Sequence, residues 1–398
     1  MNSIHELLMP SVVLYGIGSF QKVGEKAAEL GGKTLIISDP IMNKIGYVQE
    51  CKNLLKESGL AYAAYLNVDS EPTDLHVKEA MDICQLEKCD HIVAIGGGSC
   101  IDTAKAVSVL MTNGGMMADY FGTGKQLTND PLPVIAVPTT AGTGSEVTKV
   151  TVITDSSTDV KMMLADKSLL PAVSIIDANL TVSCPKGVTA ATGVDALCHA
   201  IEAYISRKAH PMTDVLALTA IDHIIGSIRT AYEDGTNLDA RSNMALGSML
   251  AGAAFSNASV TLVHGMSRPI GALFHTPHGI SNAMLLPAVL EFTLEECTDR
   301  LAEIGRRISK DTDGYSDREL AIGVVNELKQ LCSDLHITNM RAYGIDEELF
   351  MNSLAKMGAD AIASGSPANT PKIPTLEEIK ELYQTCYDYD FSQKMQLV

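Results

Sequence analysis

The sequence predicts two domains of different class: an α/β domain built on a parallel sheet, followed by an all-α domain. Over the first ~180 residues, short apolar runs alternate with amphipathic helical segments, the pattern of a parallel α/β sheet. After Cys184-Pro185, helical periodicity continues through the second half without a convincing strand. We therefore assign residues 1–182 to the first domain and 183–398 to the second.

The elements of the first domain follow in order along the chain. The candidate strands are short and apolar, as expected when helices cover both sheet faces: Thr34–Ser38, Tyr62–Leu66, His91–Ile95, Val134–Val137 and Val173–Ile176. The candidate helices between them are Lys22–Leu30, Tyr47–Ser58, Asp74–Gln85 and Ile101–Leu110.

Seven further helices are predicted in the second domain from their periodicity: Asp214–Tyr232, Asp239–Ala258, Met284–Thr293, Leu301–Ser309, Asp317–Ser333, Glu347–Lys356 and Leu376–Tyr387. The segment Ala363–Thr375 is rich in Pro, Ser and Asn, and we expect a surface loop there.

Composition excludes several classes of partner. The net charge of −18 disfavours binding to nucleic acid or to an anionic membrane surface. Nine cysteines, with no Cys-x-x-Cys pair, argue against a disulfide framework. The sequence shows neither a signal-peptide pattern nor an apolar run of about 18 residues. We expect a cytoplasmic protein that binds neither nucleic acid nor membrane.

Three segments of the first domain suggest a nucleotide site. The buried strand His91–Ile95 runs into Gly96-Gly-Gly-Ser99 and then a helix, a geometry that suits a pyrophosphate but also describes a plain strand-to-helix turn. Asp39 ends another strand, where a carboxylate can accept both ribose hydroxyls; alternatively it is a loop acid before Pro40. The third segment, Pro138-Thr-Thr-Ala-Gly-Thr-Gly-Ser-Glu146, offers hydroxyl and backbone donors, or is a polar turn.

Four residues of the second domain suggest one metal site. Asp195 and His199 lie four residues apart and share a face on a helix. His264 and His278 are separated by Pro and Gly residues, so we expect two segments joined by a turn. Three imidazoles and one carboxylate suit a divalent transition ion, although hydrogen-bonded core histidines are the alternative.

Two residues near the histidines are candidates for catalysis. His275 precedes His278 by three residues and is a proton relay, a substrate contact or a surface residue. Arg268 follows His264 by one helical turn and faces the same pocket or forms a salt bridge.

Together these segments resemble the iron-containing (group III) alcohol dehydrogenase family nearly end to end. The matching stretches also include Tyr15-Gly-Ile-Gly-Ser19, Gly193-Val-Asp195 and Thr370-Pro-Lys-Ile-Pro-Thr375. The resemblance implies a Rossmann-like first domain and an all-α second domain, the dehydroquinate synthase-like fold.

The resemblance also implies roles for individual residues. It implies that Asp195, His199, His264 and His278 hold Fe²⁺, or alternatively Zn²⁺. It implies that the nicotinamide cofactor is lined by Gly97, Gly98, Ser99, Asp102, Thr139, Thr140, Ser145 and Lys161. The acid at Asp39 is similar to that of NAD-preferring members, and members are often dimers or larger homo-oligomers.

The sequence departs from the family at Arg268, where many members carry His. Arginine does not titrate near neutrality, so it is no proton relay, but its planar fork suits a carboxylate, phosphonate or sulfonate. We expect NAD(H)-dependent reduction of a short aldehyde or oxidation of the alcohol, and hypothesise an anionic group on the substrate. The alternatives are a polyol dehydrogenase, a related lyase, or a non-catalytic nucleotide- and metal-binding sensor.

Overall fold

The computed structural model describes residues 4–309 and 311–396, which divide into two compact units. One unit is Leu8–Cys184; the other contains the chain from Pro185 onward together with residues 4–7. The sequence-based division at 182/183 falls in the short connection between η5 (Ala178–Thr181) and α6 (Lys186–Ile205). Residues 4–7 differ from expectation: the His5 ring stacks on His210 of the helical unit, with ring centroids 4.7 Å apart.

The first unit contains a six-stranded parallel sheet in the order β1-β8-β5-β4-β2-β3. The strands are β1 (Val12–Tyr15), β2 (Lys33–Ser38), β3 (Ala61–Tyr65), β4 (His91–Gly96), β5 (Val134–Pro138) and β8 (Val173–Ile176). Five of the six match the predicted strands. Sequence reasoning missed β1, which is only four residues long and lies at the sheet edge with three half-buried residues.

Sequence reasoning also missed an antiparallel hairpin, β6 (Val150–Asp155) with β7 (Val160–Ala165). Its strands are partly exposed, and only a few positions such as Thr151 and Ile153 are buried. A weakly alternating pattern gives little local indication of a strand, because pairing depends on the partner as much as on propensity.

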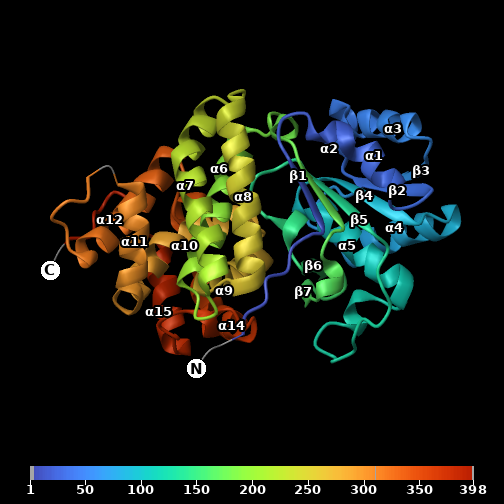
Figure 1. The fold of residues 1–398 in the computed structure, drawn as a ribbon. Helices are drawn as coiled ribbons and strands as arrows, with labels where there is room; N and C mark the ends of the chain where they lie inside the picture. The colour runs from blue at the N-terminus through green and yellow to red at the C-terminus, as the bar shows by residue number, and fades with distance from the viewer. Residues whose placement is uncertain (1–3, 310, 397–398) are drawn as a thin grey trace. The chain divides into compact units, whose positions relative to one another are not determined.

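Helices lie on both faces of the sheet (Figure 1). Alternate residues of each central strand pack against them on opposite faces, as the period of two requires. Ile36 and Val93 pack with α1 (Val23–Ala28) and α3 (Tyr47–Glu57). Leu35 and Ile92 pack with α4 (Asp74–Glu87) and α5 (Gly98–Asn113). The sheet is therefore doubly wound, as predicted. A short helix, α2 (Pro40–Ile45), follows β2.

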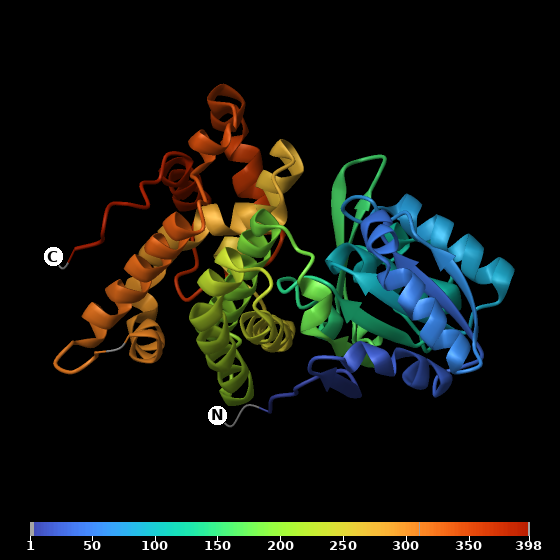
Figure 2. The same ribbon diagram turned by 90° about the horizontal axis from the view of Figure 1, so that it is seen from above.

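Within the residues that the structure describes, the second unit contains helices joined by short connections and no strand (Figure 2). Besides α6, its helices are α7 (Pro211–Glu233), α8 (Leu238–Ala258), α9 (Leu262–Phe274), α10 (His278–Thr293), α11 (Thr298–Ile308), α12 (Asp317–Asp334), α13 (Met340–Tyr343), α14 (Glu347–Ala363) and α15 (Leu376–Tyr387). Each of the seven helices predicted there is present. Helices α6, α7 and α8 pack against one another, and α10 packs on both α6 and α9.

Across the residues that the structure describes, no single helix has the length and apolarity to cross a bilayer; only α8 and α9 together, bent by 103°, pass that test.

The prediction of a surface loop over Ala363–Thr375 is wrong for the central part of this segment. Ser366, Pro367, Asn369 and Thr370 are buried, and the carbonyl oxygen of Asn369 accepts a hydrogen bond from the backbone N–H of Arg207 at 2.9 Å. Polar composition misled the prediction because small polar side chains can be buried when neighbouring backbone groups satisfy them.

Candidate functional site

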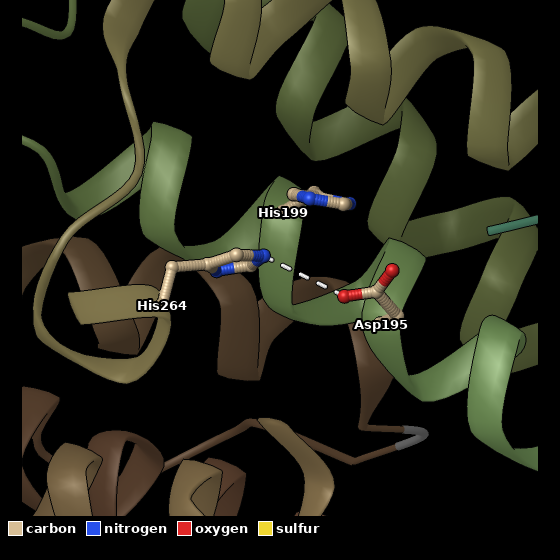
Figure 3. A group of neighbouring side chains, drawn as sticks. All are labelled: Asp195, His199 and His264. Carbon is tan, nitrogen blue, oxygen red and sulfur yellow. Dashed lines mark ion pairs between the residues drawn. The ribbon is translucent and has the colours of Figure 1, made fainter. Parts of the chain in front are cut away.

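Three of the predicted metal ligands meet inside the helical unit. Helix α6 carries Asp195 and His199 one turn apart, and His264 lies in the first turn of α9 (Figure 3). Each offers one ligand atom, and these atoms all lie within 4.8 Å of one another. His264 Nε2 lies 3.5 Å from Asp195 Oδ1. All three side chains are buried, so their polar atoms need a partner other than bulk water.

The fourth predicted ligand lies beside these three. His278 is the first residue of α10, and its Nε2 is 3.9 Å from Asp195 Oδ1. Its ring stands edge-on to that of His264, with centroids 5.2 Å apart. Helix α9 ends at Phe274 and α10 begins at His278, so the two histidines do lie on two segments joined by a turn, as predicted.

The amide of Asn282, one turn after His278, shows that this donor set fits a cation. Its Nδ2 lies 2.6 Å from Asp195 Oδ1, 3.1 Å from His264 Nε2 and 3.2 Å from His278 Nε2. An amide nitrogen carries two hydrogens, so it cannot serve three acceptors that converge on one place. Carboxylate and imidazole lone pairs that converge in a buried pocket are the donor set of a divalent transition ion.

A further carboxylate, Glu202, is fully buried next to this group. It lies one turn after His199 on α6, and its Oε2 contacts Nδ1 of His264. Its other oxygen accepts hydrogen bonds from the backbone N–H groups of Thr261, at 3.0 Å, and Val263, at 2.8 Å. Glu202 therefore contacts the side of the His264 ring opposite to Asp195.

The buried carboxylates and imidazoles shift one another's ionisation. Burial alone would raise the pKa of Asp195, but the imidazoles of His199, His278 and His264 hold it well below its usual range. Burial lowers the pKa of His264, but the carboxylates of Glu202 and Asp195 more than offset this and raise it to about 9. The site is thus strongly polarised around a carboxylate that stays ionised.

A close helix approach places His278 near Asp195. A Cβ added at Gly279 would lie 2.7 Å from the carbonyl carbon of Ala191 on α6, and closer still to its oxygen. Only glycine allows α10 to come this near, because any other side chain would strike backbone. Ala191 stands one helical turn before Asp195, so this contact sets the spacing of the two ligands.

The two candidate catalytic residues have different settings. Arg268 lies on α9 one turn after His264, partly buried, and its Nη1 donates a hydrogen bond to Ser366 Oγ at 3.3 Å. Burial lowers the pKa of Arg268 from its ordinary value, because a charged guanidinium loses hydration free energy in this position. His275 is exposed and adopts a left-handed backbone conformation, φ 52°, in the turn between α9 and α10.

In the first unit, the glycine-rich turn joins β4 to α5 as predicted. Gly96 has φ 153°, which favours glycine, and α5 begins at Gly98 with no side-chain cap at Gly97. Gly97, Gly98 and Ser99 are only partly buried, and the first N–H groups of this sixteen-residue helix have no partner within the helix. Such an N-terminus has free donors and a positive partial charge, which suits a phosphate.

The predicted hydroxyl-rich loop packs directly on that turn. It follows β5, the neighbour of β4, and a Cβ added at Gly98 would come within 2.8 Å of Thr143. A Cβ added at Gly97 would lie at ordinary contact distance from Thr140. The neighbouring Thr139 is buried. The two segments therefore form one surface at the carboxyl edge of the sheet, where parallel α/β folds bind ligands.

Asp102 and Ser145 are paired within the protein. Ser145 Oγ donates a hydrogen bond to Asp102 Oδ1 at 2.5 Å, and the Val152 backbone N–H donates to Asp102 Oδ2 at 2.9 Å. Burial raises the pKa of Asp102 above its usual value. These bonds anchor the loop and β6 to α5, a role that the sequence did not indicate.

Asp39 lies at the same edge of the sheet, after β2, and it is a helix cap. Its Oδ1 accepts hydrogen bonds from the backbone N–H groups of Ile41 and Met42, both at 2.8 Å, at the start of α2. Its Oδ2 lies 3.7 Å from the Cys100 sulfur, next to Gly96. One oxygen of Asp39 therefore has the role of the loop acid before Pro40, which was the alternative interpretation. The other oxygen lies beside the glycine turn.

Lys161 lies on the β6–β7 hairpin, and its ammonium forms an ion pair with Glu71 at 2.6 Å. A different lysine is buried in this unit: Lys105 Nζ donates to Thr148 and Val150 carbonyl oxygens, both at 2.9 Å. Burial lowers the pKa of Lys105 to about 8 and raises that of nearby Glu146 to about 7. These two groups are part of the core that supports the loop.

Sequence reasoning missed Glu202 and Asn282. Glu202 follows His199 by three residues and Asn282 follows His278 by four, so both share a helix face with a predicted ligand. That spacing was available in the sequence. It becomes informative only when the partner helices are known.

Comparisons with known proteins identify the family. The model of the family described as "Iron-containing alcohol dehydrogenase" matches residues 10–178. The model described as "Fe-containing alcohol dehydrogenase family, C-terminal" matches residues 189–387. A 1,3-propanediol dehydrogenase of Citrobacter freundii is 37% identical over 386 residues, 96% of this chain and 98% of that protein. The crystal structure of a 1,3-propanediol oxidoreductase superposes with a TM-score of 0.93 at 35% identity, covering 97% of this chain and 100% of that one.

A sulfoacetaldehyde reductase from Bifidobacterium kashiwanohense, solved in complex with NAD⁺, superposes with a TM-score of 0.87 at 26% identity, covering 98% of this chain and 100% of that one. The fold predicted from the sequence, an α/β unit followed by a helical unit, is the fold of these proteins. The chain therefore belongs to the iron-containing alcohol dehydrogenase family and is an oxidoreductase that acts on CH–OH groups.

Proposed function

We propose that the protein transfers hydride reversibly between NAD(H) and a short-chain alcohol or aldehyde, with a divalent ion, Fe²⁺ or alternatively Zn²⁺, held by Asp195, His199, His264 and His278. The observation that carries this proposal is the convergence of these four side chains in a mostly buried pocket built by α6, α9 and α10. A divalent ion bound there supplies Lewis-acid polarisation of the substrate oxygen, and NAD(H) supplies or accepts the hydride.

The protein's own part is to hold these groups and exclude water. Asp195 stays ionised among the imidazoles, so it provides negative charge for a cation at neutral pH. The apolar core around α6 and α9 lowers the local dielectric, which strengthens electrostatic interactions inside the site. His275 and Arg268 lie close in sequence to the histidine ligands; we assign His275 to substrate contact or proton exchange with solvent, and Arg268 to substrate contact.

For NAD(H), we propose the carboxyl edge of the sheet in the first unit. The N–H groups at Gly97, Gly98 and Ser99 suit the pyrophosphate, with Thr139 and Thr140 beside them. We assign Asp39 Oδ2, which lies beside the glycine turn, to accept the ribose hydroxyls and to repel a 2′-phosphate. Asp102 and Ser145 support this surface through their mutual hydrogen bond. Lys161, paired with Glu71, is the remaining candidate contact.

Arg268 supports the finer proposal that the substrate bears an anionic group. The guanidinium of Arg268 is partly buried and donates a hydrogen bond to the neutral hydroxyl of Ser366. Its charge also interacts with the Glu202 carboxylate, whose oxygens are already engaged by His264 and by the start of α9. A carboxylate, phosphonate or sulfonate on the substrate would give the guanidinium a directly bonded anion through two parallel hydrogen bonds. The sulfoacetaldehyde reductase among the similar structures is consistent with such a substrate.

The test of the metal-dependent reaction combines NADH oxidation with NADH binding. We expect that chelation, or His264→Ala, lowers turnover by at least about a thousandfold, because the Lewis acid is lost. The NADH dissociation constant should change by less than about threefold. His336→Asn is the matched control, since His336 is an exposed histidine of the same unit and Asn tolerates its left-handed φ of 55°. Full activity of metal-free protein would refute the proposal.

The test of the substrate class compares propanal, lactaldehyde and sulfoacetaldehyde at matched concentrations. For Arg268→Ala, we expect kcat/KM on sulfoacetaldehyde to fall at least about tenfold more than kcat/KM on the neutral aldehydes, the worth of a charge-assisted hydrogen bond. Equal losses on all three would show that Arg268 is structural.

The assembly of the protein as a homo-oligomer and its cytoplasmic location stay predictions.

A further inference from the structure

We infer that Glu202 is a positioning residue for the metal site: its carboxylate fixes the His264 ring in the tautomer that presents Nε2 to a metal ion. The inference rests on the proposed function, since it assumes that His264 is a metal ligand. Glu202 contacts Nδ1 of His264, while Nε2 of the ring lies toward Asp195, so Glu202 determines which nitrogen of the ring is free to bind.

Glu202 Oε1 accepts four hydrogen bonds at the start of α9. The donors are Thr261 N–H at 3.0 Å, Thr261 Oγ1 at 2.6 Å, Val263 N–H at 2.8 Å and His264 N–H at 3.4 Å. Thr261, the N-cap residue of α9, makes no capping bond of its own. Glu202 therefore caps α9 from a neighbouring helix, and this holds the first turn, which carries His264, in place.

The other oxygen of Glu202, Oε2, contacts His264 Nδ1. An ionised carboxylate only accepts hydrogen bonds, so Nδ1 must carry a hydrogen. In a neutral imidazole the remaining nitrogen, Nε2, then keeps its lone pair. That lone pair lies on the side of Asp195, 3.5 Å from its Oδ1. A carboxylate–histidine pair of this kind orients a ligand and increases its basicity toward the metal.

Glutamine at position 202 could not make the contacts that glutamate makes on both sides. The amide oxygen of Gln could face only one side. If it accepted from Thr261 and Val263, the amide N–H would face Nδ1 and force the hydrogen onto Nε2, which would block metal binding. If it faced Nδ1, the amide N–H would meet the donors at the start of α9, leaving buried donors unsatisfied. Glutamate alone accepts on both sides.

The experiment measures Zn²⁺ affinity of the full-length apoprotein by competition with a chromophoric chelator. We expect Glu202→Gln to weaken Zn²⁺ binding by about ten- to a hundredfold, the usual effect of losing such a partner. Thr261→Val is the matched control: it removes one hydrogen bond to Oε1 but keeps the carboxylate next to Nδ1, so its affinity should stay within about threefold of wild type. Circular dichroism of each apoprotein verifies folding.

A double-mutant cycle with His264→Ala separates positioning from general damage. If Glu202 acts through the His264 ring, Glu202→Gln should add less than about a threefold loss in the His264→Ala background. Equal losses in both backgrounds, or wild-type affinity for Glu202→Gln, would overturn the inference.

A second measurement needs no variant at position 202. In the Zn²⁺-loaded wild type, labelled at histidine nitrogens, we expect the ¹⁵N spectrum to show His264 protonated at Nδ1 and metal-bound at Nε2, with the assignment taken from His264→Ala. A ring bound through Nδ1 would overturn the inference while leaving the metal site intact. Failure of the wild type to bind Zn²⁺ or Fe²⁺ would instead overturn the proposed function, and this inference with it.

Discussion

Replacing Gly279 with alanine should separate two helices that must be close for the metal site to form. Gly279 is the second residue of α10, next to His278, and it faces Ala191 on α6. An added Cβ would lie 2.7 Å from the Ala191 carbonyl carbon, whereas ordinary contacts begin at 3.4 Å. The backbones must therefore move apart by at least about 0.7 Å, because the Ala191 carbonyl carbon, and its oxygen closer still, belong to the backbone and not to a flexible side chain. Metal–ligand distances tolerate only about 0.2 Å.

Two effects on stability oppose each other. Overpacking of a buried contact costs about 1–3 kcal/mol, while replacing a helical glycine by alanine gains about 0.5–1 kcal/mol. We expect a net loss of about 1–2 kcal/mol, together with at least about a tenfold loss of Zn²⁺ affinity, since His278 moves away from Asp195.

The assay combines urea unfolding, followed by circular dichroism, with chelator competition for Zn²⁺. Gly187→Ala is the matched control: Gly187 lies on α6, and a Cβ there would meet nothing within 4 Å. The control should be stabilised by about 0.4–1 kcal/mol and keep wild-type Zn²⁺ affinity. If Gly279→Ala unfolds at the same urea concentration as Gly187→Ala and binds Zn²⁺ equally well, the close approach does not set the ligand spacing.

Two further predictions concern the first unit. Burial raises the pKa of Glu146 to about 7, above its unfolded value of 4.5, so the folded chain holds a proton that the unfolded chain releases and stability falls as pH rises through this window. Glu146→Gln should therefore flatten the urea midpoint between pH 5 and 8 and stabilise the protein at pH 8 by about 2–3 kcal/mol; an unchanged pH slope would contradict this. Asp39→Ser keeps a cap for Ile41 and Met42 but removes the negative charge, so the NADPH/NADH ratio of kcat/KM should rise at least about tenfold. An unchanged ratio, measured by steady-state oxidation of both cofactors, would leave Asp39 with its capping role alone.

Helices were easier to predict than strands in this chain. The second-unit helices are long and periodic, as in Asp317–Asp334, so their local pattern alone indicates them. The missed elements, β1 and the hairpin β6–β7, are short or partly exposed, and they form because a neighbouring strand is present to pair with them. The loop around Pro367 was wrongly placed on the surface because composition does not report what covers a segment.

The candidate site divides in the same way. By itself, the sequence determined that Asp195 and His199 share a helix face, that Gly96 to Ser99 joins a strand to a helix, and that the two further histidines lie on separate segments. Those properties depend on neighbours within a few residues.

Only the tertiary structure decided which residues surround the predicted ligands. Glu202 meets His264 across 62 residues, and Asn282 meets Asp195 across 87. Gly279 is informative only because Ala191 of another helix lies against it. Such contacts arise from the packing of helices that are distant along the chain. The apolar period of a helix shows which face is buried, but it does not show which residues of another helix lie against that face. The physical reason is that the spacing of residues in the sequence specifies the helix face on which a side chain lies. The partner of that side chain depends on how whole helices bury their apolar surfaces together.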